Sequence, residues 1–133
     1  MKSKIILSVL LFINISIAGQ SRIQNLIQEG MNQAYNLELK SAELTFNKVL
    51  ELQPNSPLGY YYIAKLHFWI FLGSRDQGEY AIFIKFADLA QEKIDKVLED
   101  KPKDFRTMYI AGNINSYRAM AEATNNSTVD AFW

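Results

Sequence analysis

The tail of one helical segment is repeated later in the same chain. Residues 46–54 read FNKVLELQP and residues 94–102 read IDKVLEDKP, so both stretches share KVLE and close on a proline. Each proline ends an amphipathic helix, because proline lacks the amide hydrogen and disfavours helix in the residue before it. A further apolar or aromatic segment that reads as helix follows each one. Repetition of this kind is typical of helical units that bury their apolar faces by stacking on their neighbours.

Length and composition limit the class of protein. A chain of 133 residues has room for one domain, and 49% hydrophobic with 21% charged residues is typical of a folded globular chain. The formal net charge of zero, without a block of like charges, argues against a nucleic-acid partner or an anionic membrane surface. Cysteine is absent, which excludes disulfides, thiolate metal sites and a cysteine nucleophile.

The first 18 residues have the composition of an export signal. Two lysines precede an apolar run over residues 5–13, and small residues up to Ala18 stand where a signal peptidase cuts. The apolar run is shorter than the roughly 20 residues of a membrane-spanning helix. We therefore expect a signal peptide over residues 1–18, cleavage before Gly19 and a periplasmic or secreted product. An uncleaved membrane anchor and a buried first helix are the alternatives.

Apolar residues recur at three- and four-residue steps through the rest of the chain, which predicts α-helix. Breaks near residue 37, at Pro54, in a polar turn over 73–78 and at Pro102 separate five helices. They are expected over residues 23–37, 40–53, 57–72, 79–100 and 105–123. No segment alternates as a strand would, so the predicted fold class is all-α.

The C-terminal part of the chain carries two further expectations. The fifth helix is expected to bury Met108, Ala111, Gly112 and Tyr117. Residues 125–127 are expected to form a turn, because asparagine and serine favour turns, and Ser127 or Thr128 would then start a short sixth helix.

The helical segments resemble the tetratricopeptide repeat (TPR), a helix–turn–helix unit of about 34 residues with small and aromatic residues at fixed places. With Pro54 on the closing proline of the family, Gly30 and Ala42 fall on its small positions and Phe46 on its aromatic one. Small residues at these places allow two helices to cross closely. The tryptophan and tyrosine of the family are replaced here, so the repeats are degenerate.

The resemblance divides the domain, residues 19–133, into repeats over about 23–56, 57–104 and 105–133. The second repeat carries an insertion, and the third is incomplete because its second helix is missing apart from a stub. The implied fold is a right-handed solenoid of helical hairpins. An uncapped last unit exposes an apolar face, which predicts self-association through the C-terminal end. It also leaves open that the chain is the N-terminal part of a longer protein.

Residue types that carry catalysis or bind metals form no recognisable constellation. His67 is the one histidine, and a lone imidazole without cysteines or spaced carboxylates is a poor metal site. Glu92, Asp95 and Glu99 share a helix face with lysines and are interpreted as solvated ion pairs. We expect no enzymatic activity, no cofactor and no metal. Residues 68–72 (FWIFL) are interpreted as helix packing, with a membrane-dipping tip as the alternative.

In tetratricopeptide proteins the first helix of each unit lines a concave groove that holds peptides or partner proteins. Carried over residue by residue, the resemblance implies a groove lined by Gln24, Ile27, Met31, Leu58, Tyr61, Lys65, Arg106, Tyr109 and Asn113. Aromatic and aliphatic anchors together with two cations that can contact carboxylates suit an extended peptide.

The expected function is therefore an exported, TPR-like scaffold that binds a protein or peptide partner in the cell envelope. Two alternatives remain: the N-terminal interaction domain of a longer enzyme or transport-associated protein, and a helical protein of the membrane surface.

Overall fold

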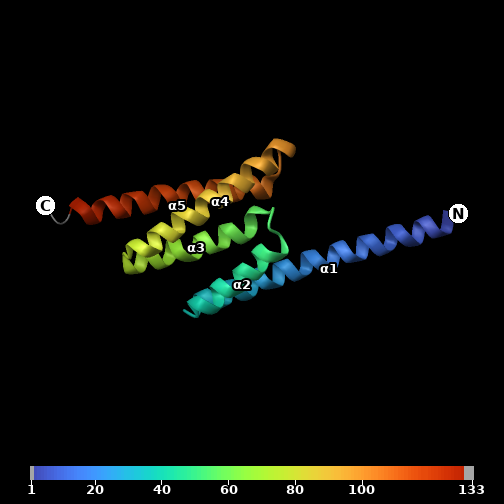
Figure 1. The fold of residues 1–133 in the computed structure, drawn as a ribbon, viewed down its shortest axis with the longest axis horizontal. Coiled ribbons are helices and arrows are strands. Elements are labelled where there is room, and N and C mark those ends of the chain that lie inside the picture. The colour runs from blue at the N-terminus through green and yellow to red at the C-terminus, as the bar shows by residue number, and fades with distance from the viewer. Residues whose placement is uncertain (1, 131–133) are drawn as a thin grey trace.

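The computed structural model describes the backbone of residues 2–130 and the side chains of residues 19–126. Over the described backbone the protein is all-α, as the periodicity predicts, and this part of the chain contains no strand. Five helices follow in order: α1 (Lys2–Tyr35), α2 (Leu39–Leu52), α3 (Pro57–Ser74), α4 (Gln77–Asp100) and α5 (Phe105–Asp130). Each helix packs antiparallel to the next, and α5 also packs against α3 (Figure 1).

Capping groups in the sequence set two of the helix starts. The Ser56 hydroxyl accepts a hydrogen bond from the backbone N–H of Leu58 (3.3 Å), which caps α3 directly after Pro54 has ended the preceding helix. The Asp76 carboxylate caps α4 in the same way, accepting the backbone N–H of Gly78 (2.6 Å). These local hydrogen bonds place the breaks where the sequence pattern predicts them.

The polar turn predicted over residues 73–78 is shorter than expected. α3 continues to Ser74 and α4 begins at Gln77, so only Arg75 and Asp76 connect the two helices. Arg75 closes α3 in the left-handed conformation (φ 60°) that glycine more often supplies at a helix end. Because Arg75 supplies this turn, the glycines at both ends of the predicted segment lie inside helices.

The turn and the sixth helix predicted from residues 125–128 are wrong. α5 continues without interruption to Asp130. No glycine or proline breaks the helix in this stretch, and the turn preference of asparagine and serine is too weak to do so alone. The Asn125 side chain instead accepts a hydrogen bond from the Gln77 amide at the start of α4 (2.9 Å). Residues 131–133 lie outside the described part of the chain.

The predicted buried face of α5 is also partly wrong. Ala111 and Tyr117 are partly buried, but Met108 and Gly112 are exposed. The fully buried residues recur at steps of three, four and seven along the helix: Thr107, Ile110, Ile114 and Ala121. α5 packs on α3 and α4 through this stripe, because these are the two helices beside it. Met108 and Gly112 face a side that no other described helix covers.

Two clusters of buried side chains hold the helices together. One lies between α3, α4 and α5 and includes Phe68, Phe83 and Ile114. The other lies between α2 and α3 and includes Phe46 and Ile63, which are 1% and 0% exposed. Burial of these large apolar side chains is the main source of stability in a domain of this kind.

The aromatic end of α3 packs against α4. The ring centres of Phe68 and Phe83 lie 5.5 Å apart, and those of Phe71 and Tyr80 lie 5.1 Å apart. Phe68 and Phe71 are fully buried, whereas Trp69 between them is half exposed. The two phenylalanines of the FWIFL segment are therefore core residues, as the packing interpretation requires.

The predicted signal segment forms the N-terminal half of α1, which is one continuous helix from Lys2 to Tyr35. Figure 1 shows this half running past the ends of the other helices. In the described part of the chain, no helix combines the length and the apolar character needed to cross a membrane. Cleavage before Gly19 stays a prediction.

Candidate binding groove

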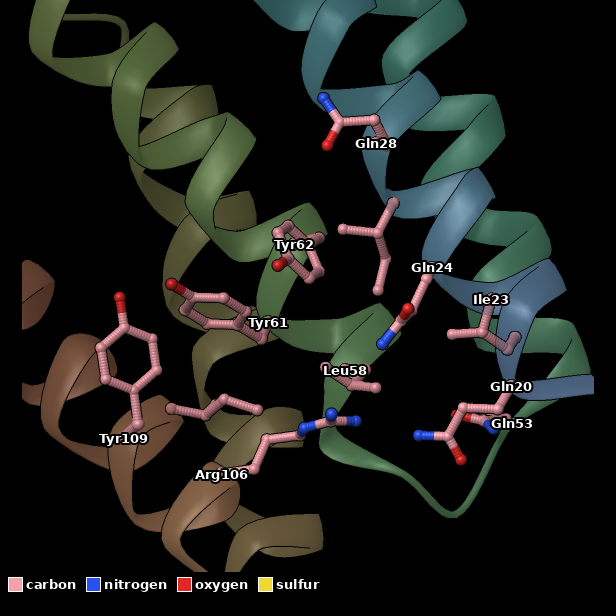
Figure 2. A pocket seen from close by; sticks show the side chains of 12 residues that line it. Gln20, Ile23, Gln24, Gln28, Gln53, Leu58, Tyr61, Tyr62, Arg106 and Tyr109 are labelled. Carbon is pink, nitrogen blue, oxygen red and sulfur yellow. The ribbon is translucent and has the colours of Figure 1, made fainter. Parts of the chain in front are cut away.

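Six of the nine residues predicted to line a groove surround one cavity. They come in pairs from three helices: Gln24 and Ile27 from α1, Leu58 and Tyr61 from α3, and Arg106 and Tyr109 from α5. The cavity has a volume of about 470 Å³. Figure 2 shows Gln24 and Arg106 reaching into the space between the helices from opposite sides.

Close contacts of α2 with its neighbours position the walls of this cavity. Gly30 on α1 leaves room for the ring of Phe46, because a Cβ on Gly30 would overlap it. Gly59 on α3 lies against the backbone of Leu50, and a Cβ on Gly59 would lie 2.6 Å from the Leu50 Cα atom. α5 packs against α3 in turn, which brings its first turns to the opposite wall.

Six further residues line the same cavity and were not predicted: Gln20, Ile23, Gln28, Gln53, Tyr62 and Ile110. Gln20, Gln24 and Gln28 follow one another at four-residue steps, so they share one face of α1. That spacing is visible in the sequence and could have extended the prediction along α1. The other four depend on how the helices pack, for which the repeat pattern contains no signal.

The cavity is rich in amides and carries one charge. Arg106 is the only charged side chain among its described lining residues, beside four glutamines, three tyrosines and four aliphatic residues. Amides both donate and accept hydrogen bonds, as an extended peptide backbone requires. The guanidinium group can bind a carboxylate through two parallel hydrogen bonds. The lining therefore suits a peptide segment that bears one anionic group.

A second cavity of about 630 Å³ adjoins the first at Tyr62, which lines both. Met31 and Lys65, two more of the predicted groove residues, line this second cavity. Lys65 is the only charged side chain among its described lining residues, and burial lowers the pKa of the Lys65 ammonium group. Its Nζ atom lies 5.9 Å from the centre of the Tyr62 ring, a distance typical of a cation–π contact. The second cavity is thus more apolar, with one cation at its wall.

The tyrosines at the junction stay neutral at physiological pH. Burial raises the pKa of Tyr61, and a hydrogen bond with Tyr117 adds to the rise. Burial also raises the pKa of Tyr62, with a further rise from the nearby Tyr109 phenol and a partial offset from the Arg106 charge. The Tyr62 hydroxyl can therefore donate a hydrogen bond to a bound peptide, whereas the Tyr61 hydroxyl is already hydrogen-bonded to Tyr117.

Asn113, the ninth predicted residue, lines neither of these cavities. It is partly buried on α5, and its Nδ2 atom is buried without a hydrogen-bond partner in the described part of the structure. The structure does not bring Asn113 together with the other eight residues.

His67 is packed between two carboxylates, away from both cavities. Its Nδ1 atom lies 2.5 Å from Oε2 of Glu79 on α4, and its Nε2 atom lies 3.6 Å from Oε1 of Glu43 on α2. The two carboxylates face opposite ring nitrogens, so they cannot share one metal ion with the imidazole. Among the described residues, no group of three or more side chains is arranged to hold a metal. With 4% exposure, His67 joins α3 to both neighbouring helices.

The acidic residues of α4 make exposed contacts along their own helix. Glu92 accepts hydrogen bonds from Lys96 (2.7 Å) and Lys93 (3.3 Å), and these bonds lower the pKa of its carboxyl group. Asp95 accepts a hydrogen bond from the Gln91 amide (2.7 Å). Their arrangement agrees with solvated pairs at helical spacing rather than with paired acid and base groups in a cleft.

Comparison of the chain with protein-family models, curated proteins and solved structures found no match. The candidate function therefore depends on the geometry and chemistry of the cavities between α1, α3 and α5.

Proposed function

We propose that this protein is a non-enzymatic, exported scaffold that binds an extended peptide or a segment of a partner protein in the cell envelope. The observation that carries the proposal is the shared cavity: three helices far apart in the sequence each supply two of the predicted lining residues. We further propose a TPR-like right-handed solenoid as the arrangement that produces this surface.

The packing of α2 and α4 supports the solenoid. Gln33 on α1 accepts a hydrogen bond from Thr45 on α2 (2.8 Å), and His67 on α3 contacts Glu79 on α4. Gln33 and His67 occupy the same position of their repeats, one turn after the small residue that meets the covering helix. Each covering helix also packs against the first helix of the next unit. The covering helices α2 and α4 thus make corresponding contacts in the two hairpins, which supports a stacked arrangement, although α3 packs closely on α5 but not on α1.

The lining favours a ligand with a free carboxylate. Arg106 and Lys65 are the charged side chains of the two cavities in the described chain, and both are cationic. Lys65 is partly buried, which strengthens a charge-assisted hydrogen bond relative to one in open water, whereas Arg106 is exposed. Glutamines along α1 would pair with the peptide backbone, and Tyr61, Tyr62 and Leu58 would contact apolar side chains. The preferred ligand is therefore an extended peptide with an acidic side chain or a free C-terminus.

Fluorescence anisotropy with a panel of labelled peptides tests the proposal. The panel pairs each peptide that ends in a free carboxylate with its C-terminally amidated counterpart, and includes acidic and neutral sequences. We expect binding of the carboxylate forms, weakened by Arg106→Gln about 10- to 100-fold, because a hydrogen bond to a charged group contributes roughly 1.5–3 kcal/mol.

Lys48→Gln is the matched control, because Lys48 is an exposed cation on α2 that lines neither cavity. It should leave the dissociation constant unchanged. Equal binding by the Arg106→Gln variant and the unaltered chain, or no binding by any peptide of the panel, would remove the groove from consideration.

Export is tested separately by the N-terminus of the protein recovered outside the cytoplasm. N-terminal sequencing or intact-mass measurement should find a chain that begins at Gly19. Recovery of the full-length chain from the cytoplasm alone would contradict export and leave the groove untouched.

A further inference from the structure

The face of α5 opposite to the core carries no charged side chain over residues 105–123. Phe105 and Met108 on this face are 79% and 48% exposed. The other exposed residues at helical spacing on it are small or neutral: Gly112, Asn115, Ser116, Ala119 and Ala123. A helix face that meets water normally carries charged side chains. We call these seven residues the outer face of α5.

Equivalent positions on the two earlier first helices are covered. Gly30 on α1 lies against the Phe46 ring of α2, and Ala64 on α3 is fully buried in the cluster shared with α4. Gly112 stands at the matching place in α5, and a Cβ built on it would meet nothing within 4 Å. The described chain thus supplies a covering helix to α1 and to α3 but not to α5.

We propose that the outer face of α5 is covered by the same face of a second copy of this chain. In an antiparallel helix pair with its two-fold axis at Gly112, each residue meets the residue equally far on the other side of that glycine. Phe105 then meets Ala119, and Met108 meets Ser116. Each large side chain meets a small one, and the paired glycines let the two backbones approach closely.

Charge favours a second copy as the occupant. The outer face is neutral, so two copies meet without opposing like charges. At its edge, Glu122 of one copy comes level with the turn of the other copy that carries Lys101 and Lys103. Asp104 in the same turn accepts the backbone N–H of Thr107 (2.8 Å) and keeps its negative charge, so the two lysines leave residues 101–104 with a net positive charge. This pairing does not depend on what the groove binds, so it goes beyond the proposed function.

Sedimentation velocity of the full chain over a range of micromolar concentrations tests the pairing. We expect a reversible dimer, and Met108→Glu should raise its dissociation constant at least tenfold. Leu44→Glu is the matched control, since Leu44 is 66% exposed on α2 and lies outside the outer face. Gly112→Leu should also weaken the dimer while leaving the helical circular dichroism signal intact, because the position is open within one copy.

The absence of cysteine allows a second, geometric readout. Gly112→Cys should form an intermolecular disulfide under mild oxidation, because the proposed axis brings the two positions within the Cα separation that a disulfide spans, about 4.4–6.8 Å. Ala81→Cys, exposed on α4, should not cross-link at a comparable rate. Monomers at every concentration, a dimer that Met108→Glu leaves intact, or equal cross-linking at both positions would overturn the proposal.

Discussion

Substitution of Gly59 by alanine tests the close approach of the α2 and α3 backbones that positions the groove. A Cβ at this position would lie 2.6 Å from the Cα and Cβ atoms of Leu50 and 2.7 Å from its nitrogen. These are mostly backbone atoms of α2, so no side-chain rotation can relieve the overlap. Ordinary contact begins at 3.4 Å, so α2 and α3 would have to separate by about 0.8 Å.

The cost follows from two opposing terms. A gap of 0.5–1 Å forfeits roughly a quarter to a half of the dispersion energy of each affected contact, and overpacked core substitutions cost about 1–3 kcal/mol. Exchanging glycine for alanine in a helix returns roughly 0.5–1 kcal/mol by lowering the entropy of the unfolded chain. We therefore expect Gly59→Ala to lower the free energy of unfolding by up to about 2.5 kcal/mol.

Gly73→Ala is the matched control, because Gly73 lies in the same helix and a Cβ there would meet nothing within 4 Å. The contribution of helix propensity is similar in both variants. The difference between their free energies of unfolding therefore measures the cost of the steric overlap alone, about 1–3 kcal/mol. Urea unfolding followed by circular dichroism gives this difference, and thermal scans should show a shift of roughly 4 °C for each kcal/mol. Equal midpoints for the two variants would refute the described approach of α2 to α3.

Three further outcomes follow from single side chains. Phe46→Ala should cost about 3–5 kcal/mol in urea unfolding, because the ring is 1% exposed and its removal leaves a cavity between α1, α2 and α3. Asp76→Ala should cost roughly 1 kcal/mol in the same assay, since the carboxylate accepts two backbone N–H groups at the start of α4. Hydrogen bonds from Thr107 lower the pKa of Asp104 below its usual value of 3.8, so the stability that it contributes is complete above pH 3.8 and is lost as the pH falls through the lowered pKa. Acid titration of unfolding should show a smaller loss in this range for Asp104→Asn than for the unaltered chain; an identical pH dependence would contradict the cap.

Several features of the fold are local and could be predicted from the sequence. Pro54 and Ser56 end one helix and start the next through the missing amide hydrogen and a hydroxyl cap, both of which act within a few residues. The turn between α3 and α4 was predicted too long, because the left-handed conformation of Arg75 has no sequence signal comparable to a glycine. The sequence predicted a turn near Asn125, but α5 continues past it. Asparagine and serine favour turns there, yet no glycine or proline is present to end the helix.

Part of the candidate site could also be predicted from the sequence. The repeat resemblance named nine residues, and eight of them line two adjoining cavities. The resemblance could not show which of these residues line which cavity. It also could not show that Tyr62 lines both cavities. Gln20 and Gln28 could have been predicted as well, because each lies four residues from Gln24 and therefore on the same face of α1. Asn113 lines neither cavity, and its position relative to α3 depends on how α5 packs.

The sequence by itself determined that the chain is helical, where most helices begin and end, and which residues are small enough for close crossing. Those properties arise from backbone chemistry and periodicity within a few turns. Only the tertiary structure decided which faces are covered: Gly30 and Gly112 occupy the same position in the predicted repeats, yet one lies against the Phe46 ring and the other is open. The physical reason is that a side chain is buried only when a second surface packs against it. The sequence pattern of one helix does not show whether another helix covers that face.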